Sequence, residues 1–395
     1  MLQNLKETKF FKNISKTMSY SRIRQHFPMV EPYYLDDRDR LEPAEIVHID
    51  WPNNVQKPVV GIVRNFGKWP NWTKYRRFLE NNHIPFEFYN IHAQNWLKEA
   101  DKYDVIIGIS SNDFYILQEL RRKYYLLETY LGKYCYPSFK HTMLYEDKNL
   151  EAYIGKVLEI PFVNTYISHD KKDALRLIEN LTYPIVSKID PSSGSVGVEL
   201  VRNVGQARKI VKQSFSGSGR RTHLAYCKQK NYVYFQDFVP NDGYDIRVIV
   251  LGNWVFGYYR KVLEGDFRAS GMGLVELRDL TKEPMLIARN VNKMIKSPML
   301  AIDMVKGMDG KYYILEFSPL FEVNTTSQLR VNDIPGLYIF DDDETYHFEE
   351  HRYWIQELAL KQFLLMDYLP KIRQRKQDSA TQMLDHFIVN RLNQR

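Results

Sequence analysis

Cysteine is nearly absent from this sequence. The chain has two cysteines among 395 residues, Cys135 and Cys227, and neither stands in a Cys-x-x-Cys or Cys/His spacing. These spacings exclude a disulfide framework and a zinc site of the usual kind, and reduced thiols are expected. The sequence also has no apolar run of membrane-spanning length, and its first residues have no apolar signal-peptide core. We therefore expect a cytoplasmic protein with no membrane association.

A block of basic residues is also missing. The formal net charge is +7, but lysine and arginine alternate with acidic residues along most of the chain. This pattern favours a mixed surface with a positively lined anion-binding cleft over a nucleic-acid footprint. The hydrophobic content of 44% and aromatic content of 14% predict a folded protein, and 395 residues predict two or three lobes.

Two common nucleotide-binding signatures do not occur. The chain has no Gly-x-Gly-x-x-Gly in its α/β region, and residues 188–201 read KIDPSSGSVGVELV. A Walker A loop ends in Gly-Lys-Ser/Thr and opens a helix, whereas here the lysine comes first and a strand follows. A Walker A loop is excluded, and a plain hairpin or another kind of phosphate-binding flap remains open.

The hydrophobic patterns change along the chain. Residues 58–134 alternate between strand and helix patterns, which predicts a small parallel α/β lobe ending in a long helix over 114–134. Residues 138–215 predict an α+β region that opens with one helical stretch over 138–158, and the Gly/Ser/Arg-rich residues 216–223 predict a mobile connection. Residues 351–372 predict a peripheral helix pair.

Two hairpins are predicted in the second half. With Gly252-Asn253 as a turn, Asp245 lies opposite Arg260 and Arg247 opposite Tyr258. With Asp309-Gly310 as a turn, a symmetric register puts Asp303 directly across from Glu316.

Two acids on one face of a sheet repel each other unless a cation lies between them. Carboxylate oxygens suit Mg²⁺ bridged to nucleotide phosphates, although two acids on a sheet edge can also point into solvent. Lys188, Arg247 and Arg268 lie in or just beyond strand-like segments and add positive charge. Together, these residue types predict a phosphate-binding site.

The order of these motifs resembles the ATP-grasp ligases, particularly the branch that includes the ribosomal-protein glutamate ligases. In that family an Asp-Lys pair opens a helix, like Asp147-Lys148, and a strand lysine precedes a Gly-rich flap, like KIDPSSGSVGV. FQDFVP is similar to the adenine-binding strand, and EGDFR to the Glu-Gly-Glu-Phe-Arg segment. The resemblance covers residues 58–330.

The resemblance implies a site for ATP and two Mg²⁺ ions, with Mn²⁺ as a substitute. Its implied ATP contacts are Lys148, Lys188, Ser193, Gly194, Ser195, Gly197, Gln236, Asp237, Phe238, Val239 and Asp245. Lys188, Arg247 and Arg268 are the implied catalytic cations. Asp303 and Glu316 are the implied metal ligands, with Ser318 where the family has asparagine and Asn324 as a compensating ligand. Arg260 is open between holding the acceptor carboxylate and making a salt bridge.

The resemblance implies a fold of mixed class, α+β/α/β. It consists of an ATP-grasp fold of two α+β subdomains, with a small Rossmann-like α/β lobe before it and a helical extension after it. The expected limits are an N-terminal extension at 1–52, the lobe at 53–139, the ATP-grasp domain at 140–340 and C-terminal helices at 341–395. The ATP-grasp domain divides into 140–235 and 236–340.

The implied activity joins a carboxylate to an amine through an acyl phosphate, in peptide, natural-product or surface-polysaccharide modification. An ATP-grasp kinase acting on a hydroxyl is the alternative, and a basic nucleic-acid scaffold is a third reading. The oligomeric state is open, a homodimer being the commonest assembly.

Overall fold

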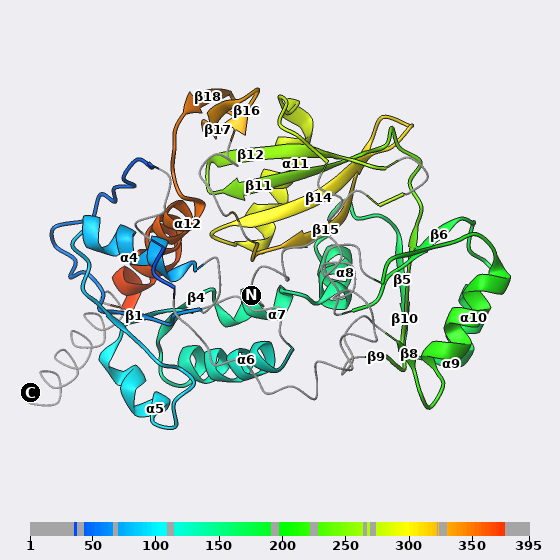
Figure 1. Cartoon of the computed structure of the whole chain (residues 1–395), viewed down its shortest axis with the longest axis horizontal. Coiled ribbons are helices and arrows are strands. Elements are labelled where there is room, and N and C mark those ends of the chain that lie inside the picture. The colour runs from blue at the N-terminus through cyan, green and yellow to red at the C-terminus, as the bar shows by residue number, and fades with distance from the viewer. Residues whose placement is uncertain are drawn as a thin grey trace, which may run out of the picture.

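The computed structural model in Figure 1 describes residues 35–37, 43–65, 70–108, 114–190, 197–221, 228–263, 267–268, 274–321, 323 and 330–375. It has an N-terminal α/β lobe, a small antiparallel sheet and a large central sheet, in line with the predicted fold class. Across these residues, no helix is long and apolar enough to cross a bilayer.

The N-terminal lobe is a parallel sheet with the strand order β2-β1-β3-β4. Its strands are β1 (Val60–Ile62), β2 (Phe86–Phe88), β3 (Val105–Ile107) and β4 (Tyr134–Tyr136), and its main helices are α4 (Trp72–Asn81) and α6 (Phe114–Thr129), with the short α5 (Trp96–Glu99) and 3-10 turn η2 (Ala100–Lys102) between them. The helix predicted over 114–134 is therefore too long, and β4 was missed. Gly132 adopts φ +61, a left-handed conformation that favours glycine, and so ends the helical region before β4.

Two helices replace the single helical stretch expected over 138–158. They are α7 (Phe139–Leu144) and α8 (Lys148–Val157). Asp147 caps α8 by accepting a hydrogen bond from the amide of Leu150 at 2.9 Å, which requires the chain to leave the helical conformation there. The expectation that Asp147-Lys148 opens a helix is confirmed.

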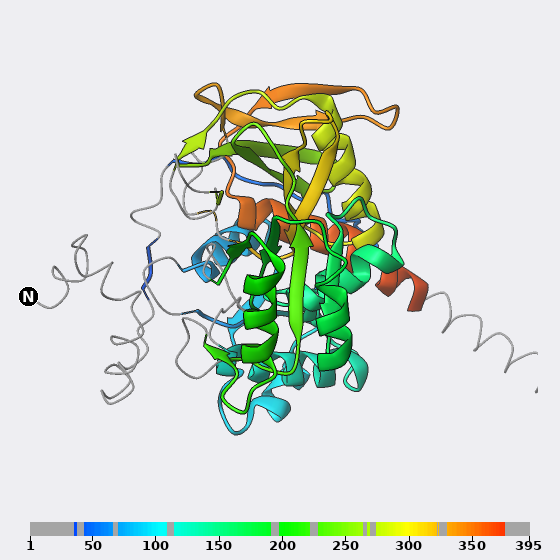
Figure 2. The ribbon, with the colours of Figure 1, turned by 90° about the vertical axis from the view of Figure 1, so that its right-hand side faces the viewer.

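The small sheet has the strand order β5-β10-β6-β7. It consists of β5 (Thr165–Ser168), β6 (Ile185–Ser187), β7 (Glu199–Val201) and β10 (Val233–Asp237), with α9 (Lys171–Leu177) and α10 (Val204–Ser214). Helix α8 packs on one face of this sheet, and α9 and α10 cover the other (Figures 1 and 2). The sheet thus places β6 and β10 beside the central sheet.

The predicted mobile connection is partly wrong. β8 (Arg220–Arg221) pairs with β9 (Lys228–Gln229), so that Arg220 lies opposite Gln229. Arg220 is buried because its guanidinium has polar partners beneath the small sheet, which the sequence pattern did not reveal.

The central sheet has eight strands and contains both predicted hairpins. In β11 (Tyr244–Leu251) and β12 (Trp254–Lys261), Asp245 pairs with Arg260 and Arg247 with Tyr258, as predicted. In β14 (Leu300–Lys306) and β15 (Tyr312–Ser318), Asp303 pairs with Glu316, as predicted. The turn is one residue longer than the predicted two-residue turn, which shifts the pairing near it, so that Met304 pairs with Ile314. An irregularity at Leu315 shifts the pairing back, so that Asp303 pairs with Glu316.

The central sheet continues with strands that were not predicted. β13 (Val275–Glu276) and β17 (Ile334–Phe340) both pair with β12 on the side away from β11, and β16 (Arg330–Val331) and β18 (Tyr346–Glu350) pair with β17. Helix α11 (Lys282–Ile295) packs against the face of this sheet that carries Val248 and Ile302. The domain limits set out above stay a prediction.

The peripheral helix pair expected over 351–372 is wrong. Helix α12 (Ile355–Phe363) continues through a π-helical turn at Leu364–Tyr368 into one helical segment. Its residues Leu358 and Leu360 are fully buried in a core shared with Ile62 of the N-terminal lobe and Leu251 of the central sheet. The helix is apolar because it fills the junction between these two units (Figure 1).

Candidate nucleotide-binding site

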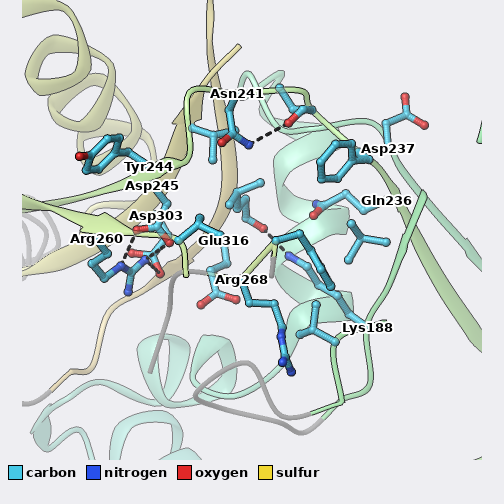
Figure 3. Close-up of a pocket in the computed structure, with 18 of the residues that line it drawn as sticks. Lys188, Gln236, Asp237, Asn241, Tyr244, Asp245, Arg260, Arg268, Asp303 and Glu316 are labelled. Atoms are coloured by element: carbon cyan, nitrogen blue, oxygen red, sulfur yellow. Dashed lines mark hydrogen bonds and ion pairs between the residues drawn. The ribbon is translucent and has the colours of Figure 1, made fainter. Parts of the chain in front are cut away.

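A cavity of about 890 Å³, including its open mouth, lies between the small sheet and the central sheet. Figure 3 shows its polar residues converging from both sheets. It is lined by Lys148, Val186, Lys188, Val198, Gln236, Asp237, Phe238, Val239, Asn241, Tyr244, Asp245, Arg260, Val262, Phe267, Arg268, Asp303, Val305, Leu315 and Glu316.

Two lysines enter the cavity from the small-sheet side. Lys188 directly follows β6, and its Nζ donates to the carbonyl of Leu315 at 3.1 Å. Burial lowers the pKa of Lys188, an effect that Glu316 partly offsets. Lys148 begins α8, and its Nζ lies 3.7 Å from Glu316 Oε2. Burial also lowers the pKa of Lys148, but Glu316 and Glu151 outweigh it and raise this pKa above its usual value.

The end of β10 forms the upper part of the cavity. The Gln236 side chain donates to Thr165 Oγ1 at 3.0 Å, and Asp237 Oδ2 accepts from Asn164 Nδ2 at 2.9 Å. Both side chains are therefore held against β5, and the chain after them, Phe238 and Val239, lines the cavity. The apolar side chains that share this cavity are Val186, Val198, Val305 and Leu315, which provide surfaces suited to a flat ring.

The central-sheet wall holds a network of four charges: Asp245, Arg260 and Asp303 are buried (Figure 3), and Arg247 is half-buried. Arg247 donates to both oxygens of Asp303 at 2.7 Å. Arg260 donates to Asp245 at 2.6 and 2.8 Å, and its Nη2 lies 2.8 Å from Asp303 Oδ2. The register explains the network, because Arg247 is the cross-strand neighbour of Asp303, and Asp245 of Arg260.

The two aspartates in this network have opposite pKa shifts. Burial raises the pKa of both carboxyls, but at Asp303 the charges of Arg247 and Arg260 outweigh burial and hold its pKa well below the usual range. At Asp245 burial wins over the nearby Arg260 and raises the pKa to about 6. The same pairing raises the pKa of Arg260, against burial, through Asp303 and Asp245.

Glu316 is less enclosed than Asp303. Its side chain is 34% exposed and faces the cavity (Figure 3). Behind it, the buried Glu151 of α8 accepts from the amide of Phe317 at 3.2 Å. Burial raises the pKa of Glu151 well above its usual value, against the charge of Lys148.

These donors fit a Mg²⁺ ion shared with phosphate oxygens better than an ion held by the protein alone. In the described part of the chain, no three His, Cys, Asp or Glu side chains cluster as metal ligands. Asp303 Oδ1 accepts from Arg247 Nε, and a carboxylate oxygen has a second lone pair for a metal. Glu316 opposes Asp303 across β14 and β15. Mg²⁺ commonly takes one or two carboxylates and completes its shell with water and phosphate.

The cavity contains most of the predicted site residues. It brings together Lys148, Lys188, Gln236, Asp237, Phe238, Val239, Asp245, Arg260, Arg268, Asp303 and Glu316. Arg247 is not among its lining residues and lies behind Asp303. Ser318 also lies apart from the lining, and its Oγ donates to the carbonyl of Leu320 at 2.7 Å. Arg268 extends on the Lys188 side of the cavity in Figure 3.

The structure describes only some of the predicted flap residues and metal ligands. Ser193, Gly194, Ser195 and Asn324 lie outside the described residues. Gly197 is described and adopts φ +76, and a Cβ there would lie 3.1 Å from Ile189 Cβ. The backbone therefore requires glycine at this position, immediately before the cavity residue Val198.

Several cavity residues were missed from the sequence. Asn241 and Tyr244 lie in the β10–β11 connection and at the start of β11, where turn residues gave no signal of a ligand. Leu315 contributes a carbonyl at an irregularity that no sequence pattern marks. Glu151 follows Lys148 by three residues, a helical spacing that would have placed both side chains on one face of α8.

Comparison with known proteins agrees with this geometry. Residues 141–334 match the RimK-like ATP-grasp domain. The alpha-aminoadipate–LysW ligase LysX of Saccharolobus solfataricus is 27% identical over 273 residues, which cover 67% of this chain and 94% of that protein.

Solved structures also align with much of this chain. A RimK domain protein of Sphaerobacter thermophilus aligns with a TM-score of 0.44 and 14% identity, covering 66% of this chain and 90% of that one. The D-alanine–D-alanine ligase of Bacillus anthracis aligns with a TM-score of 0.47 and 13% identity, covering 67% and 87%. Residues 141–334 are therefore similar to the RimK-like ATP-grasp domain, and most of the chain is similar to a protein named as a ligase.

Proposed function

We propose that the protein joins a carboxylate to an amine at the cavity described above, through an acyl phosphate and with release of ADP and phosphate. The observation that carries this proposal is the convergence of Lys148, Lys188 and Arg268 on one cavity with Asp303 and Glu316. Cations from separate elements and two opposed acids are what a metal-bound triphosphate requires.

In this proposal ATP binds in the following orientation. The adenine ring lies against the apolar side chains beside Phe238 and Val239, with Gln236 and Asp237 flanking it, and Asp245 faces the ribose. The triphosphate then extends toward Lys148, Lys188 and Glu316. Gly197 and the flap residues Ser193, Gly194 and Ser195 cover it in this proposal, because small residues allow backbone amides to approach phosphate oxygens.

Two Mg²⁺ ions, or Mn²⁺ in their place, are held by Asp303 and Glu316 in this proposal. When bound, they neutralise phosphate charge and polarise the phosphoryl oxygens. Arg247 fixes both oxygens of Asp303, which orients this carboxylate. Ser318 is bonded to its own loop, so we assign it a weaker contribution than the asparagine usual in the family, with Asn324 as the compensating ligand.

The reaction follows from the placement of the cations. A substrate carboxylate oxygen attacks the γ-phosphorus, the bond to the β–γ bridging oxygen breaks, and ADP leaves. The amine then attacks the acyl carbon, phosphate departs with the C–O bond electrons, and the amine loses a proton. Lys188 and Arg268 lower the repulsion between the carboxylate and the triphosphate, and Arg247 acts through Asp303.

Of the two roles that the sequence left open for Arg260, this proposal adopts the salt bridge. Its guanidinium is bonded to Asp245 and Asp303 and is buried, so we assign it to shaping the cavity wall rather than to capturing an acceptor carboxylate. The carboxylate and amine remain to be identified. The related LysX carries the name of a ligase that joins alpha-aminoadipate to LysW, and an amino acid is therefore the first substrate class to test.

The test is a panel of carboxylates and amines incubated with ATP and Mg²⁺, scored for ADP release that needs both partners. Hydroxylamine is then added in place of the amine. An acyl phosphate yields a hydroxamate, whereas a kinase that phosphorylates a hydroxyl yields none and leaves phosphate on its product. ADP release without hydroxamate would overturn the ligase assignment in favour of that kinase.

A further inference from the structure

The buried guanidinium of Arg220 contacts both residues of the last pair in the β6/β7 ladder. Its Nη1 donates to Ser187 Oγ at 2.9 Å, and its Nη2 lies 2.8 Å from Glu199 Oε1. Ser187 and Glu199 are direct cross-strand partners and form the final pair of that ladder. One side chain from a separate ribbon thus holds both strands at the point where they diverge.

Arg220 is itself held in place. Its Nη1 also donates to Gln229 Oε1 at 2.9 Å, and Gln229 is the residue opposite Arg220 in the β8/β9 ribbon. Arg220 is 6% exposed, and Ser187 and Gln229 are fully buried. The hydrogen bonds from Nη1 to Ser187 and Gln229 hold the guanidinium in place, because breaking either one would leave a buried polar group without a partner, at a cost in free energy.

The residues next to this pair face the nucleotide cavity. Successive side chains in a strand point to opposite faces, and cross-strand partners share a face. Ser187 and Glu199 face Arg220, so their neighbours Lys188 and Val198 face the other way, and both line the cavity. The amide of Lys188 still donates to the carbonyl of Tyr234 at 3.2 Å, so the strand geometry extends to this residue.

We propose that Arg220 is a positioning residue that sets Lys188 and Val198 against the bound nucleotide from the opposite face of the small sheet. This inference rests on the proposed function, since it takes Lys188 as a phosphate contact and Val198 as a contact of the nucleotide. Arg220 touches neither the nucleotide nor the reacting atoms. Arg220 acts through its contacts with Ser187 and Glu199. Removing it is therefore expected to change the affinity for ATP more than any other property.

Arg221 provides a matched control. It is the same residue type, it is the next residue of β8, and it is exposed and paired across the ribbon with Lys228 rather than with the hairpin. Arg220→Ala, Arg220→Lys and Arg221→Ala are compared with the wild type by calorimetric titration with MgATP, well below the melting temperature of each variant. Hydrogen exchange at the amides of Ser187, Lys188 and Glu199 is followed in parallel.

Arg220→Ala is expected to weaken MgATP binding about tenfold, which corresponds to about 1.4 kcal/mol. Faster exchange is expected at these three amides, and Arg220→Lys should restore part of the affinity because one ammonium cannot reach both strands. Arg221→Ala should bind as the wild type does. A purely structural role would lower the melting temperature of Arg220→Ala without changing the ATP affinity of the folded protein.

Equal affinity in the wild type and Arg220→Ala would overturn this inference alone, whereas a wild type that does not bind MgATP would overturn the proposed function. If Arg220→Ala does not fold, Glu199→Gln carries the test, because the Glu199 side chain is 58% exposed and its loss leaves the core intact. Glu199→Gln should weaken MgATP binding about two- to fivefold, a loss below that expected for Arg220→Ala. Unchanged affinity in this variant would equally overturn the positioning role.

Discussion

The two walls of the cavity use charge in different ways. On the central-sheet wall, Arg247 and Arg260 are bonded to Asp245 and Asp303 at 2.6–2.8 Å, so two cations and two anions neutralise one another. On the opposite wall, Lys188 donates to a backbone carbonyl, and Lys148 lies 3.7 Å from Glu316. On the central-sheet wall the charged side chains form short ion pairs with one another. On the opposite wall the Lys148–Glu316 ion pair is longer, and Lys188 bonds to a neutral carbonyl.

This difference separates residues that build the site from residues available to a ligand. A buried ion pair costs desolvation of both charges, and the cost is recovered only when the geometry is good and the pair stays intact. The central-sheet network therefore behaves as a unit. A lysine bonded to a carbonyl keeps donors that a phosphate can use, because an ammonium has three.

The largest expected effect comes from comparing the two opposed acids of the central sheet, Asp303 inside the ion-pair network and Glu316 facing the lysines. Asp303→Asn leaves the buried Arg260 and the half-buried Arg247 without their shared anionic partner, which should abolish turnover and lower the free energy of unfolding by about 3–5 kcal/mol. Glu316→Gln should also abolish turnover, but its side chain is 34% exposed, so its unfolding free energy should change by about 1 kcal/mol or less. Chemical denaturation and ADP release measure the two properties separately.

This pair of variants also tests the metal assignment. Full turnover in Glu316→Gln would refute the role of Glu316 as a metal ligand. Equal stability losses in both variants would refute the contrast between the closely paired Asp303 and the more exposed Glu316.

The next prediction tests the wall of the cavity that carries Lys148 and Lys188. Lys188→Met keeps the length of the side chain and removes a charge whose burial is unfavourable, as its lowered pKa indicates. We expect kcat/KM for ATP to fall by about 10²–10³-fold, a factor typical of losing one donor to a transition-state charge. The melting temperature should stay the same or rise, and a clear fall would mean that Lys188 supports the fold rather than the ligand.

How far the sequence predicted these walls depends on the kind of interaction. The hairpin registers followed from turn residues and strand periodicity, so the pairs Asp245–Arg260 and Asp303–Glu316 were correct. That Arg247 and Arg260 both bond to Asp303 was not predictable, because β14 pairs with β11 across more than fifty residues of sequence. Local patterns do not encode such long-range pairing.

The same limit explains the errors in the fold. Residues 216–223 have the composition of an exposed turn, and only the tertiary partners Ser187 and Glu199 make Arg220 a buried residue. Helix α12 has an apolar pattern that predicts packing, but the pattern does not say on what. The site motifs were found because each is a short local sequence.

A smaller effect tests whether the guanidinium network needs its fork geometry. Arg260→Lys keeps the charge but replaces contacts to Asp245 and Asp303 with a single ammonium. We expect a loss of about 1.5–3 kcal/mol in unfolding free energy, the range for hydrogen bonds to charged groups. Thermal unfolding measures it. A variant as stable as the wild type would show that charge alone is sufficient on this wall.

The smallest effect concerns Asp190, just after Lys188. Burial raises its pKa from 3.8 to about 6, against the charge of Lys148. Between these two values the folded protein binds a proton that the unfolded chain has released, so this group makes stability fall as the pH rises from about 4 to 6. Asp190→Asn keeps an oxygen to accept from Asn149 and removes the titration.

The variant should therefore match the wild type near pH 4 and be more stable by about 1–3 kcal/mol above pH 6, after allowance for the attraction to Lys148 that it loses. Urea unfolding at both pH values measures the difference. The Asp303 carboxyl has the opposite dependence, because its lowered pKa gives stability that is lost as the pH falls below its usual range. A pH-independent difference between Asp190→Asn and the wild type would mean that Lys148 already holds Asp190 ionised. The charges on the wall that carries Lys148 and Lys188 would then be as closely paired as those on the central-sheet wall.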